Sequence, residues 1–388
     1  MFVSYRWGHT RIHALKIGFD ARLISSLGIG RYISGLLPFL AEILRDRLVV
    51  IGGRNDIALL RAMTSGQAQL IVSNARPYRL AEQSTLLRDL MRIRLPLIHF
   101  PHYNLPLAYP GRFVVTIHDL FSFQFPEIHS GPLPRAFNRI LITNAVARAA
   151  AVIAPSRATS AEVAQRFPSA QPRLVPIAEA ADARFSAVHN PTAEAAWQRY
   201  FDIRPPFFLY LGQWKTYKNL LVLIQAFADV VRVRPDAQLV IAGHDPRHAE
   251  IPAAAASLPA GAVVFPGHLP EDAIADLYRS AAAVVLPSRA EGFGLPVLEG
   301  MACGVPVICS DLPVLRELAD GIATFCDPSS ASSFAAGMSA ALDADDPARI
   351  ERGLARAGSY NWKTAAEETV TIYERVLAGR PRSLSETD

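Results

Sequence analysis

The sequence predicts an α/β protein with two doubly wound domains, each a parallel sheet with helices on its faces. The chain has 388 residues, more than one hydrophobic core usually organises. Short apolar runs typical of buried strands alternate with helical patterns in both halves of the chain. The composition shifts around residues 189–191 and again around 204–206. We therefore expect a first domain at residues 1–190, a second at 205–360 and a last helix at 361–378.

The composition narrows the class of protein and its location. Apolar residues make up 51% of the chain and charged residues 19%, which is typical of globular proteins. The net charge of +4 suits anionic lipid or a diphosphate substrate and singles out neither. No run of eighteen apolar residues occurs and residues 1–15 lack the apolar segment of a signal peptide. The three cysteines have no zinc-like spacing, so we expect a reducing cytoplasm.

The expected strands fall into two series, one in each half of the chain. In the first half they are residues 16–20, 48–51, 70–72, 97–100, 113–117, 151–154 and 173–177. In the second half they are residues 206–211, 239–242, 263–265, 282–286, 305–309 and 324–326. In doubly wound sheets ligands bind beyond the carboxyl ends of the strands. Polar residues directly after a strand are therefore the first candidates for a site.

The most informative stretch is residues 282–311, where a strand, a loop, a helix and a second strand follow one another. Glu291 lies in the loop and Glu299 about one turn into the helix. Gly292 and Gly294 would let a ligand approach the backbone in front of the helix. The free N–H groups and the dipole of a helix start favour an anion such as a diphosphate. Carboxylates on either side of such an anion suit a nucleotide sugar, which offers hydroxyl groups on its ribose and its sugar ring.

This stretch resembles the Glu-(seven residues)-Glu signature of the retaining glycosyltransferases of family 4, which have the GT-B fold of two Rossmann-like domains facing a central cleft. The resemblance implies that Glu291 contacts hydroxyl groups of the transferred sugar and that Glu299 contacts the ribose. The backbone amides that would hold the diphosphate are those of Gly292, Phe293, Gly294 and Leu295. A buried helix with two incidental acids is the weaker alternative.

A second donor motif is expected at the start of the second domain. Two of the chain's four lysines, Lys215 and Lys218, lie in the loop between a strand and a helix, where cations can meet a phosphate. The loop resembles the family's glycine and Lys-Asn donor motif, with Lys218 in the place of the diphosphate-binding lysine. Gln213 stands where a basic residue is common in the family. Lys215 would then supply the missing positive charge.

In the first half, Gly28 and Gly30 are expected in a loop between the first strand and a helix at residues 32–44. The match to a dinucleotide-binding fingerprint is poor, because no third glycine falls at the required position. The resemblance implies that this loop lies beside the donor diphosphate, so we assign both glycines to donor binding.

Polar residues that follow two neighbouring strands are expected at one edge of the first sheet. His118 and Asp119 come after residues 113–117, and His99 and His102 come at or just after the strand that ends near residue 100. His118 resembles the family's cleft histidine, which implies that it stabilises positive charge at the anomeric carbon or places the acceptor. We find no second acid near His118 in the sequence.

Acceptor binding is assigned by the same resemblance. His102, Tyr103 and Asn104 resemble acceptor-side residues of mannosyltransferase-like members, and Asp119 follows the cleft histidine. The two histidines at positions 99 and 102 lie in an extended stretch that does not direct both at one ion, so no metal site is expected.

Residues 76–94 carry five arginines in an amphipathic helical pattern. Such a helix can lie on an anionic membrane surface. The alternative is a solvated helix that packs on the sheet. The sequence leaves both open.

The chain is therefore expected to be a metal-independent, α-retaining glycosyltransferase without a cofactor. Our best prediction is transfer of mannose from GDP-mannose to a glycan or polyprenyl-diphosphate-linked acceptor in polysaccharide assembly, in the cytoplasm or peripherally on the inner face of the plasma membrane. A sugar-nucleotide epimerase or hydrolase of the same fold, or a non-catalytic module that binds sugar nucleotides or glycans, are the alternatives. An NAD-dependent oxidoreductase is disfavoured by the missing glycine fingerprint, and nucleic-acid binding by the lack of a basic–aromatic motif.

Overall fold

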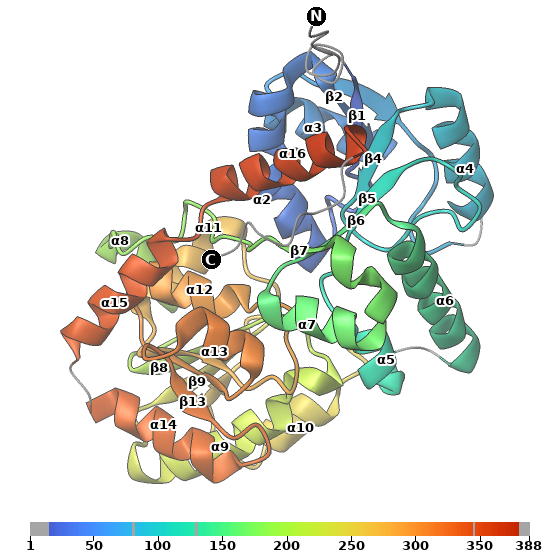
Figure 1. Cartoon of the computed structure of the whole chain (residues 1–388). Helices are drawn as coiled ribbons and strands as arrows, with labels where there is room; N and C mark the ends of the chain where they lie inside the picture. The colour runs from blue at the N-terminus through green and yellow to red at the C-terminus, as the bar shows by residue number, and fades with distance from the viewer. Residues whose placement is uncertain (1–14, 80–81, 129–130, 344–345, 380–388) are drawn as a thin grey trace, which may run out of the picture. The chain divides into compact units, whose positions relative to one another are not determined.

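The computed structural model describes residues 15–79, 82–128, 131–343 and 346–379. The N-terminal stretch in which we expect no signal peptide therefore lies almost wholly outside the described residues. The chain divides into two compact units. The first unit comprises residues 1–179 and 361–388, and the second comprises residues 180–360 (Figure 1).

The first unit contains a seven-stranded sheet in the order β3-β2-β1-β4-β5-β6-β7, and all of its neighbouring strands are parallel. Its strands are β1 (Ile17–Asp20), β2 (Leu48–Gly52), β3 (Gln69–Val72), β4 (Leu97–Phe100), β5 (Phe113–Thr116), β6 (Ala151–Ala154) and β7 (Leu174–Pro176). Its α-helices are α2 (Leu27–Leu44), α3 (Ile57–Met63), α4 (Glu82–Ile93), α5 (Phe121–Gln124), α6 (Pro132–Arg148), α7 (Arg157–Arg166) and α16 (Trp362–Leu377). Short 3₁₀ turns are η1 (Arg45–Arg47), η2 (Arg54–Asp56), η3 (Pro126–Ile128) and η4 (Pro168–Arg173).

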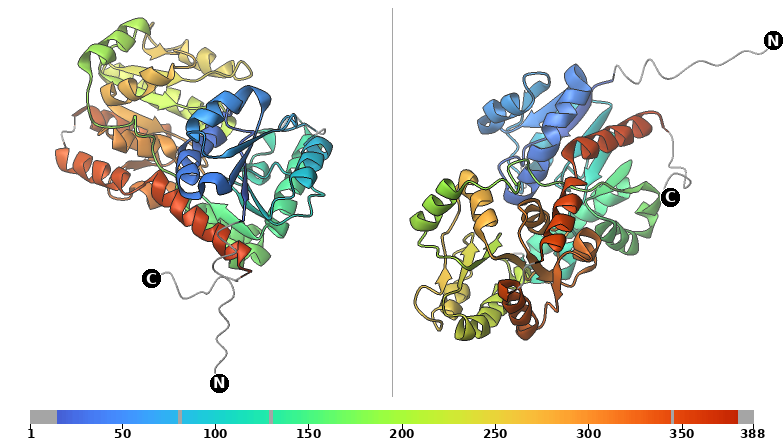
Figure 2. Two further views of the ribbon diagram at one scale, coloured as in Figure 1. Left: turned by 90° about the horizontal axis from the view of Figure 1, so that it is seen from above. Right: turned by 90° about the vertical axis from the view of Figure 1, so that its left-hand side faces the viewer.

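The second unit contains a six-stranded parallel sheet in the order β10-β9-β8-β11-β12-β13. Its strands are β8 (Phe207–Leu211), β9 (Gln238–Ala242), β10 (Val263–Val264), β11 (Ala283–Leu286), β12 (Val307–Ser310) and β13 (Thr324–Cys326). Its helices are α8 (Pro191–Tyr200), η5 (Thr216–Lys218), α9 (Leu220–Val233), α10 (Glu250–Ala255), α11 (Glu271–Ser280), α12 (Leu295–Ala302), α13 (Pro313–Ala319), α14 (Ala331–Asp343) and α15 (Pro347–Gly358). Figure 2 shows helices lying over the strands of each unit.

The predicted fold class is confirmed, because every run predicted as a strand overlaps a strand of one of the two sheets. The central strands β1, β4, β5 and β6 are buried at each residue. A strand with helices on both faces has no solvent side, so it carries a continuous apolar run instead of an alternating one. The edge strand β3 is only partly buried, as an edge position allows.

The last helix, α16, belongs to the first unit and packs against α2 (Figure 1). A Cβ atom added at Gly35 of α2 would come within 2.1 Å of the Trp362 ring, so only glycine permits this close approach of the two helices. Tyr373 of the same helix lies fully buried against His99 of β4. The end of the chain therefore completes the core of its beginning.

Helix α4 corresponds to the arginine-rich stretch at residues 76–94. Its Leu86 and Leu90 are buried in the core of the first unit, whereas Met91 is 47% exposed. The helix thus packs on the sheet, and a contact with membrane has no support in these observations. A different segment, Leu27–Arg47, is long and apolar enough to cross a membrane by length and composition alone. Eight residues of α2 within this segment are buried in the first unit. A helix buried in a protein core can be as long and as apolar as a membrane-spanning one.

Candidate functional site

In the second unit, two loops that carry the predicted donor residues meet at one edge of the sheet. Strands β8 and β11 are parallel neighbours, so the loops that follow their carboxyl ends lie side by side. The backbone N–H of Arg289 in one loop donates to the carbonyl oxygen of Tyr217 in the other at 2.7 Å. The Asn219 amide donates to the carbonyl oxygens of Pro287 at 3.0 Å and Pro328 at 2.7 Å. Asn219 has a left-handed φ of 61°, a conformation that asparagine tolerates better than most residues.

Lys218 and Glu291 form an ion pair between these two loops. The Lys218 Nζ lies 2.6 Å from Glu291 Oε1, and the two side chains are 15% and 8% exposed. Ser288, which is fully buried, donates its hydroxyl to the same carboxylate oxygen at 2.5 Å. The structure therefore brings together the predicted sugar-binding carboxylate and the predicted phosphate-binding lysine. Sequence analysis missed Ser288 and gave no role of its own to Asn219, the asparagine of the Lys-Asn motif.

The loop after β11 leads directly into the start of α12. Gly294 caps this helix with φ of 104°, and a Cβ atom there would come within 2.5 Å of the Leu315 side chain. The glycine is thus required by its left-handed backbone and by its packing against α13. Phe293 is buried, with its ring 5.8 Å from that of Tyr360. The contacts of Gly292, Phe293, Gly294 and Leu295 with a diphosphate stay a prediction.

Glu299 lies one turn into α12 and is only 2% exposed. One of its carboxylate oxygens accepts a hydrogen bond from the Tyr278 hydroxyl of α11 at 2.8 Å. In this structure Glu299 joins two helices of the second unit. Its predicted contact with a ribose stays a prediction.

Lys215 contacts a carboxylate in the segment that follows β9. The Lys215 Nζ lies 3.6 Å from Asp245 Oδ2, and the Arg247 side chain donates to both oxygens of Asp245 at 2.9 and 2.6 Å. The hydrogen bonds from Arg247, helped by the charge of Lys215, hold the pKa of Asp245 below its usual range. Gln213 is exposed and its carbonyl oxygen accepts from the Tyr210 hydroxyl at 2.9 Å.

In the first unit, the prediction that Gly28 and Gly30 lie in a loop is wrong. Helix α2 begins at Leu27, so both glycines belong to its first turn. No atom lies within 4 Å of a Cβ built at Gly28, whereas a Cβ at Gly30 would approach the Ile24 carbonyl oxygen to 2.3 Å. The helical pattern extends farther toward the N-terminus than the apolar residues alone suggested.

His99 does not project from the sheet edge, which corrects our expectation. It lies within β4 and is fully buried. Its Nδ1 is 2.6 Å from the Tyr373 hydroxyl and its Nε2 is 2.8 Å from the Thr116 hydroxyl. Burial, together with the charge of His118, lowers the pKa of His99 to about 3. This histidine is a neutral part of the core.

The predicted acceptor residues do lie together in the loop after β4. His102 Nδ1 is 2.6 Å from Asn104 Oδ1, so the proton of the neutral ring lies on Nδ1. Burial, with the charge of His118, lowers the pKa of His102 to about 3, although the Asn104 bond opposes this. The His102 and Tyr103 rings are 3.8 Å apart. Asn104 is 2% exposed, and its amide nitrogen has no hydrogen-bond partner among the described residues.

His118 has an acidic partner that the sequence analysis missed. Its Nδ1 lies 3.1 Å from Glu179 Oε1, and its Nε2 lies 2.9 Å from the Pro101 carbonyl oxygen. Burial alone would lower the pKa of His118, but the hydrogen bond and charge of Glu179, with the Pro101 carbonyl and Asp119, raise it above its ordinary value. The expectation that no second acid lies near His118 is therefore wrong. Glu179 is 61 positions away in the sequence, in a segment without a motif. Asp119 accepts from the Phe121 backbone N–H at 3.0 Å, just before α5.

A buried ion cluster contacts the loop after β4 that contains Asn104. Arg22 contacts Asp20 at 2.7 Å and Glu82 at 2.8 Å, and all three side chains are nearly inaccessible. Arg22 also donates to the carbonyl oxygens of Ala75 at 3.0 Å and Asn104 at 3.4 Å. From the sequence, Glu82 could be an acid on the solvent side of its helix. In the structure it faces the core.

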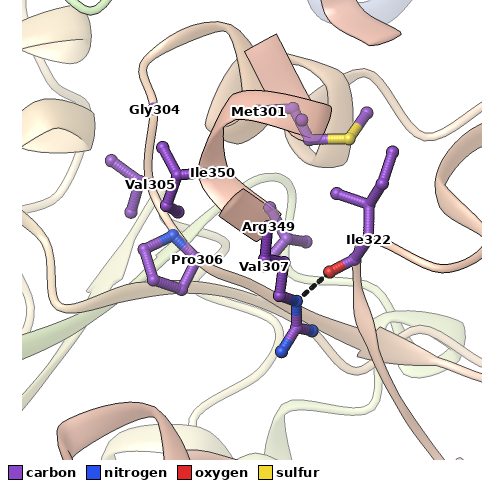
Figure 3. Close-up of a pocket in the computed structure, with 9 residues that line it drawn as sticks. Met301, Gly304, Val305, Pro306, Val307, Ile322, Arg349 and Ile350 are labelled. Carbon is purple, nitrogen blue, oxygen red and sulfur yellow. Dashed lines mark hydrogen bonds between the residues drawn. The ribbon is translucent and has the colours of Figure 1, made fainter. Parts of the chain in front are cut away.

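The second unit also contains a pocket of about 220 Å³, part of it open to solvent, lined by apolar residues and Arg349 (Figure 3). Arg349 donates to the Ile322 carbonyl oxygen and to the Thr324 hydroxyl. The pocket adjoins the amino end of β12, opposite the loops that hold Lys218 and Glu291, and contains none of the predicted site residues. Among the described residues, no group of three or more His, Cys, Asp or Glu side chains is arranged to hold a metal ion.

Two Rossmann-like units and a Lys–Glu pair before a helix start are the arrangement expected of a two-domain glycosyltransferase. Comparison with family models agrees: residues 28–183 match "Glycosyltransferase Family 4" and residues 193–353 match "Glycosyl transferases group 1". The two models together span most of the chain, which thus belongs to the glycosyltransferases that they describe.

Similar proteins place the chain within a broad group. O-antigen chain mannosyltransferase B of Escherichia coli is 25% identical over 370 residues, which are 92% of this chain and 94% of the relative. Sucrose-phosphate synthase of Thermosynechococcus elongatus has a TM-score of 0.74 at 20% identity, covering 94% of this chain and 100% of that one. Anabaena HepE, solved in complex with UDP-glucose, has a TM-score of 0.73 at 18% identity, covering 92% and 99%. These two structures have the same fold as this chain.

Proposed function

We propose that the protein transfers a sugar from a nucleotide-sugar donor to a glycan or polyprenyl-diphosphate-linked acceptor, with retention of the α configuration and without a metal ion. The observation that carries the donor half is the Lys218–Glu291 pair at the edge where the loops after β8 and β11 meet. Mannose from GDP-mannose is the preferred donor, because a relative that matches nearly the whole chain is a mannosyltransferase. A UDP-sugar is the competing choice, since HepE was solved with UDP-glucose.

The geometry around Glu291 suits a sugar-binding carboxylate. Both of its hydrogen bonds described above end on Oε1, so Oε2 is the oxygen we assign to the sugar hydroxyls. Lys218 holds the carboxylate in place, and we assign its positive charge to the donor diphosphate. A positive group at a departing diphosphate stabilises the negative charge that develops there.

In the first unit, we assign acceptor binding to the loop of His102, Tyr103 and Asn104, with Asp119 beside it. The unsatisfied Asn104 amide nitrogen offers a donor to an acceptor hydroxyl oxygen. In the transfer itself, the bond from the anomeric carbon to the phosphate oxygen breaks while the acceptor oxygen bonds to the same face of that carbon. The departing phosphate oxygen takes the acceptor proton, so no carboxylate nucleophile is required.

The first experiment is thermal stabilisation of the full chain by GDP, UDP, ADP, TDP and the matching nucleotide sugars, with and without EDTA. A ligand that binds only the folded protein raises its melting temperature by mass action. Stabilisation by GDP-mannose that EDTA leaves unchanged supports the proposal, and a response to UDP-sugars alone replaces the mannose assignment. Product analysis then separates the alternatives. An epimerase or hydrolase consumes the donor without an acceptor, and a binding module leaves it intact.

We also propose that the protein is cytoplasmic and that it binds peripherally to the membrane. Sedimentation with vesicles that contain anionic lipid tests the membrane binding. Binding that survives physiological salt supports it, and a protein that stays in the supernatant speaks against it.

A further inference from the structure

Glu179 is a buried acid of the first unit to which the proposed function gives no role. Glu179 is 5% exposed and follows β7, at the point where the chain leaves the first unit. Its carboxylate contacts His118 across 61 positions of sequence. An ionic side chain buried to this degree requires a partner to offset its lost hydration, and His118 is that partner.

We propose that Glu179 is a positioning residue that holds the His118 ring with both N–H groups engaged inside the protein, so that His118 serves the transfer as a fixed positive charge and takes no proton from the acceptor. The inference rests on the proposed function for its catalytic meaning. The contact itself is independent of that function.

The atoms on either side of the ring determine its protons. The Pro101 carbonyl oxygen can only accept, so Nε2 at 2.9 Å must carry a hydrogen. At Nδ1 two arrangements satisfy the 3.1 Å contact with Glu179: an imidazolium beside a carboxylate, or a neutral ring beside a carboxylic acid. The charges around the ring favour the imidazolium, since Glu179 and Asp119 both raise the pKa of His118.

The other groups that face the ring do not compete for this proton. His99 and His102 are neutral, with pKa values lowered to about 3. Tyr32 places its ring at 4.9 Å in an edge-on contact, and burial raises the pKa of its hydroxyl. Among the described groups, Glu179 and Asp119 are the anions that act on His118.

This assignment changes the chemistry expected of His118. A ring with both nitrogens bonded to protein acceptors has no lone pair for a proton, so it cannot act as general base. Its positive charge also opposes a cation at the anomeric carbon and instead favours the negative charge of a departing diphosphate. The proton of the acceptor then goes to the departing phosphate oxygen.

The test compares Glu179→Gln with Glu194→Gln. Glu194 contacts His189 in the second unit, with Nδ1 to Oε1 also at 3.1 Å, but the His189 side chain is 54% exposed and Glu194 also lies 3.5 Å from Arg279. The His118 ring signal is followed by NMR in isotopically labelled protein and identified by its loss in His118→Gln. In parallel, kcat/KM for transfer is measured from about pH 5.5 to about pH 9, the range in which histidine titrates.

We expect the His118 signal of the unaltered protein to stay in the doubly protonated form above its ordinary titration range, and to titrate at lower pH in Glu179→Gln. The alkaline limb of kcat/KM should shift in the same direction, leaving roughly a tenfold deficit near pH 8.5 and a small one near pH 6, because one pKa unit corresponds to a factor of ten. Glu194→Gln should keep both the signal and the profile.

Two results would overturn the proposal: a neutral His118 ring in the unaltered protein at about pH 6.5, its ordinary pKa, or a loss of activity in Glu179→Gln that is equal at all pH values with no shift of the ring signal. The second result would mark Glu179 as merely structural. If no nucleotide sugar is turned over, the proposed function fails, while the NMR titration still decides whether Glu179 holds the charge of His118.

Discussion

Each unit of this glycosyltransferase contains a buried pair of a basic side chain and a glutamate, and the two pairs differ in kind. In the second unit Lys218 meets Glu291 at 2.6 Å, and in the first unit His118 meets Glu179 at 3.1 Å. A lysine ammonium is charged throughout the neutral range, whereas a histidine carries charge only while its surroundings favour protonation. Loss of a partner should therefore abolish function at any pH in the second unit but make it pH-dependent in the first.

The largest effect is expected from Glu291→Ala. The change removes the carboxylate assigned to the sugar hydroxyls and leaves the Lys218 ammonium without its partner. We expect kcat/KM to fall by roughly 10²–10³-fold or more, the loss found when one transition-state contact is removed. Steady-state kinetics at two pH values checks this, with circular dichroism to verify folding. Near-normal kcat/KM in a folded variant would refute the role of Glu291.

Lys218→Ala should have a smaller effect that depends on the phosphates of the ligand. Because a charged hydrogen bond contributes about 1.5–3 kcal/mol, the Kd of the nucleotide sugar and nucleoside diphosphate should rise by roughly 10–100-fold, with little change for the nucleoside. Isothermal titration calorimetry measures all three. Lys363→Ala, an exposed lysine on α16, is the matched control and should leave each Kd unchanged. Equal losses for diphosphate and nucleoside would argue against a phosphate contact by Lys218.

The His118–Glu179 pair should also make stability depend on pH. Because the pKa of His118 is raised in the folded state, its stabilisation is fully present below about pH 6.5, the unfolded value, and is lost as the pH rises through the folded value. Glu179→Gln should therefore cost about 1–3 kcal/mol in the free energy of unfolding near pH 6 and less near pH 9. Urea unfolding of both proteins at each pH gives the difference. A cost that grows with pH would contradict the sign of this argument.

The two units also differ in how far the sequence alone predicts them. Strands were predictable throughout, because a strand covered on both faces is a nearly continuous apolar run, as β6 and β11 are. The two residues of the pair in the second unit could be predicted from the sequence, since Lys218 and Glu291 each belong to a local motif that precedes a helix. The contacts of Glu179 and Arg22 could not be predicted from the sequence, because their partners come close only in the folded sheet. Burial cannot be inferred from residue type for a charged side chain, as Glu82 shows.

Asn219 offers a test of how the loops of the second unit are held. It combines a left-handed backbone with two hydrogen bonds, to Pro287 and Pro328. Asn219→Gly keeps the backbone and loses the bonds, so it should cost about 1–3 kcal/mol in the free energy of unfolding. Asn219→Ala loses both and should cost roughly 1–2 kcal/mol more. Chemical unfolding ranks the two variants. An alanine variant as stable as the glycine variant would show that the left-handed backbone is not maintained.

The smallest effects are expected at the two glycines that were assigned to the donor. Gly28 lies in the first turn of α2 with open space around it, so Gly28→Ala should be neutral or stabilise the fold by up to about 1 kcal/mol, because alanine favours a helix. Gly30→Ala forces a methyl group against the Ile24 carbonyl oxygen and should destabilise. Thermal unfolding distinguishes the two, and donor Kd in Gly28→Ala addresses function separately. A well-folded Gly28→Ala protein with donor affinity reduced tenfold would show that the donor approaches this helix start. Unchanged affinity would remove Gly28 from the donor site and would assign donor recognition to the second unit.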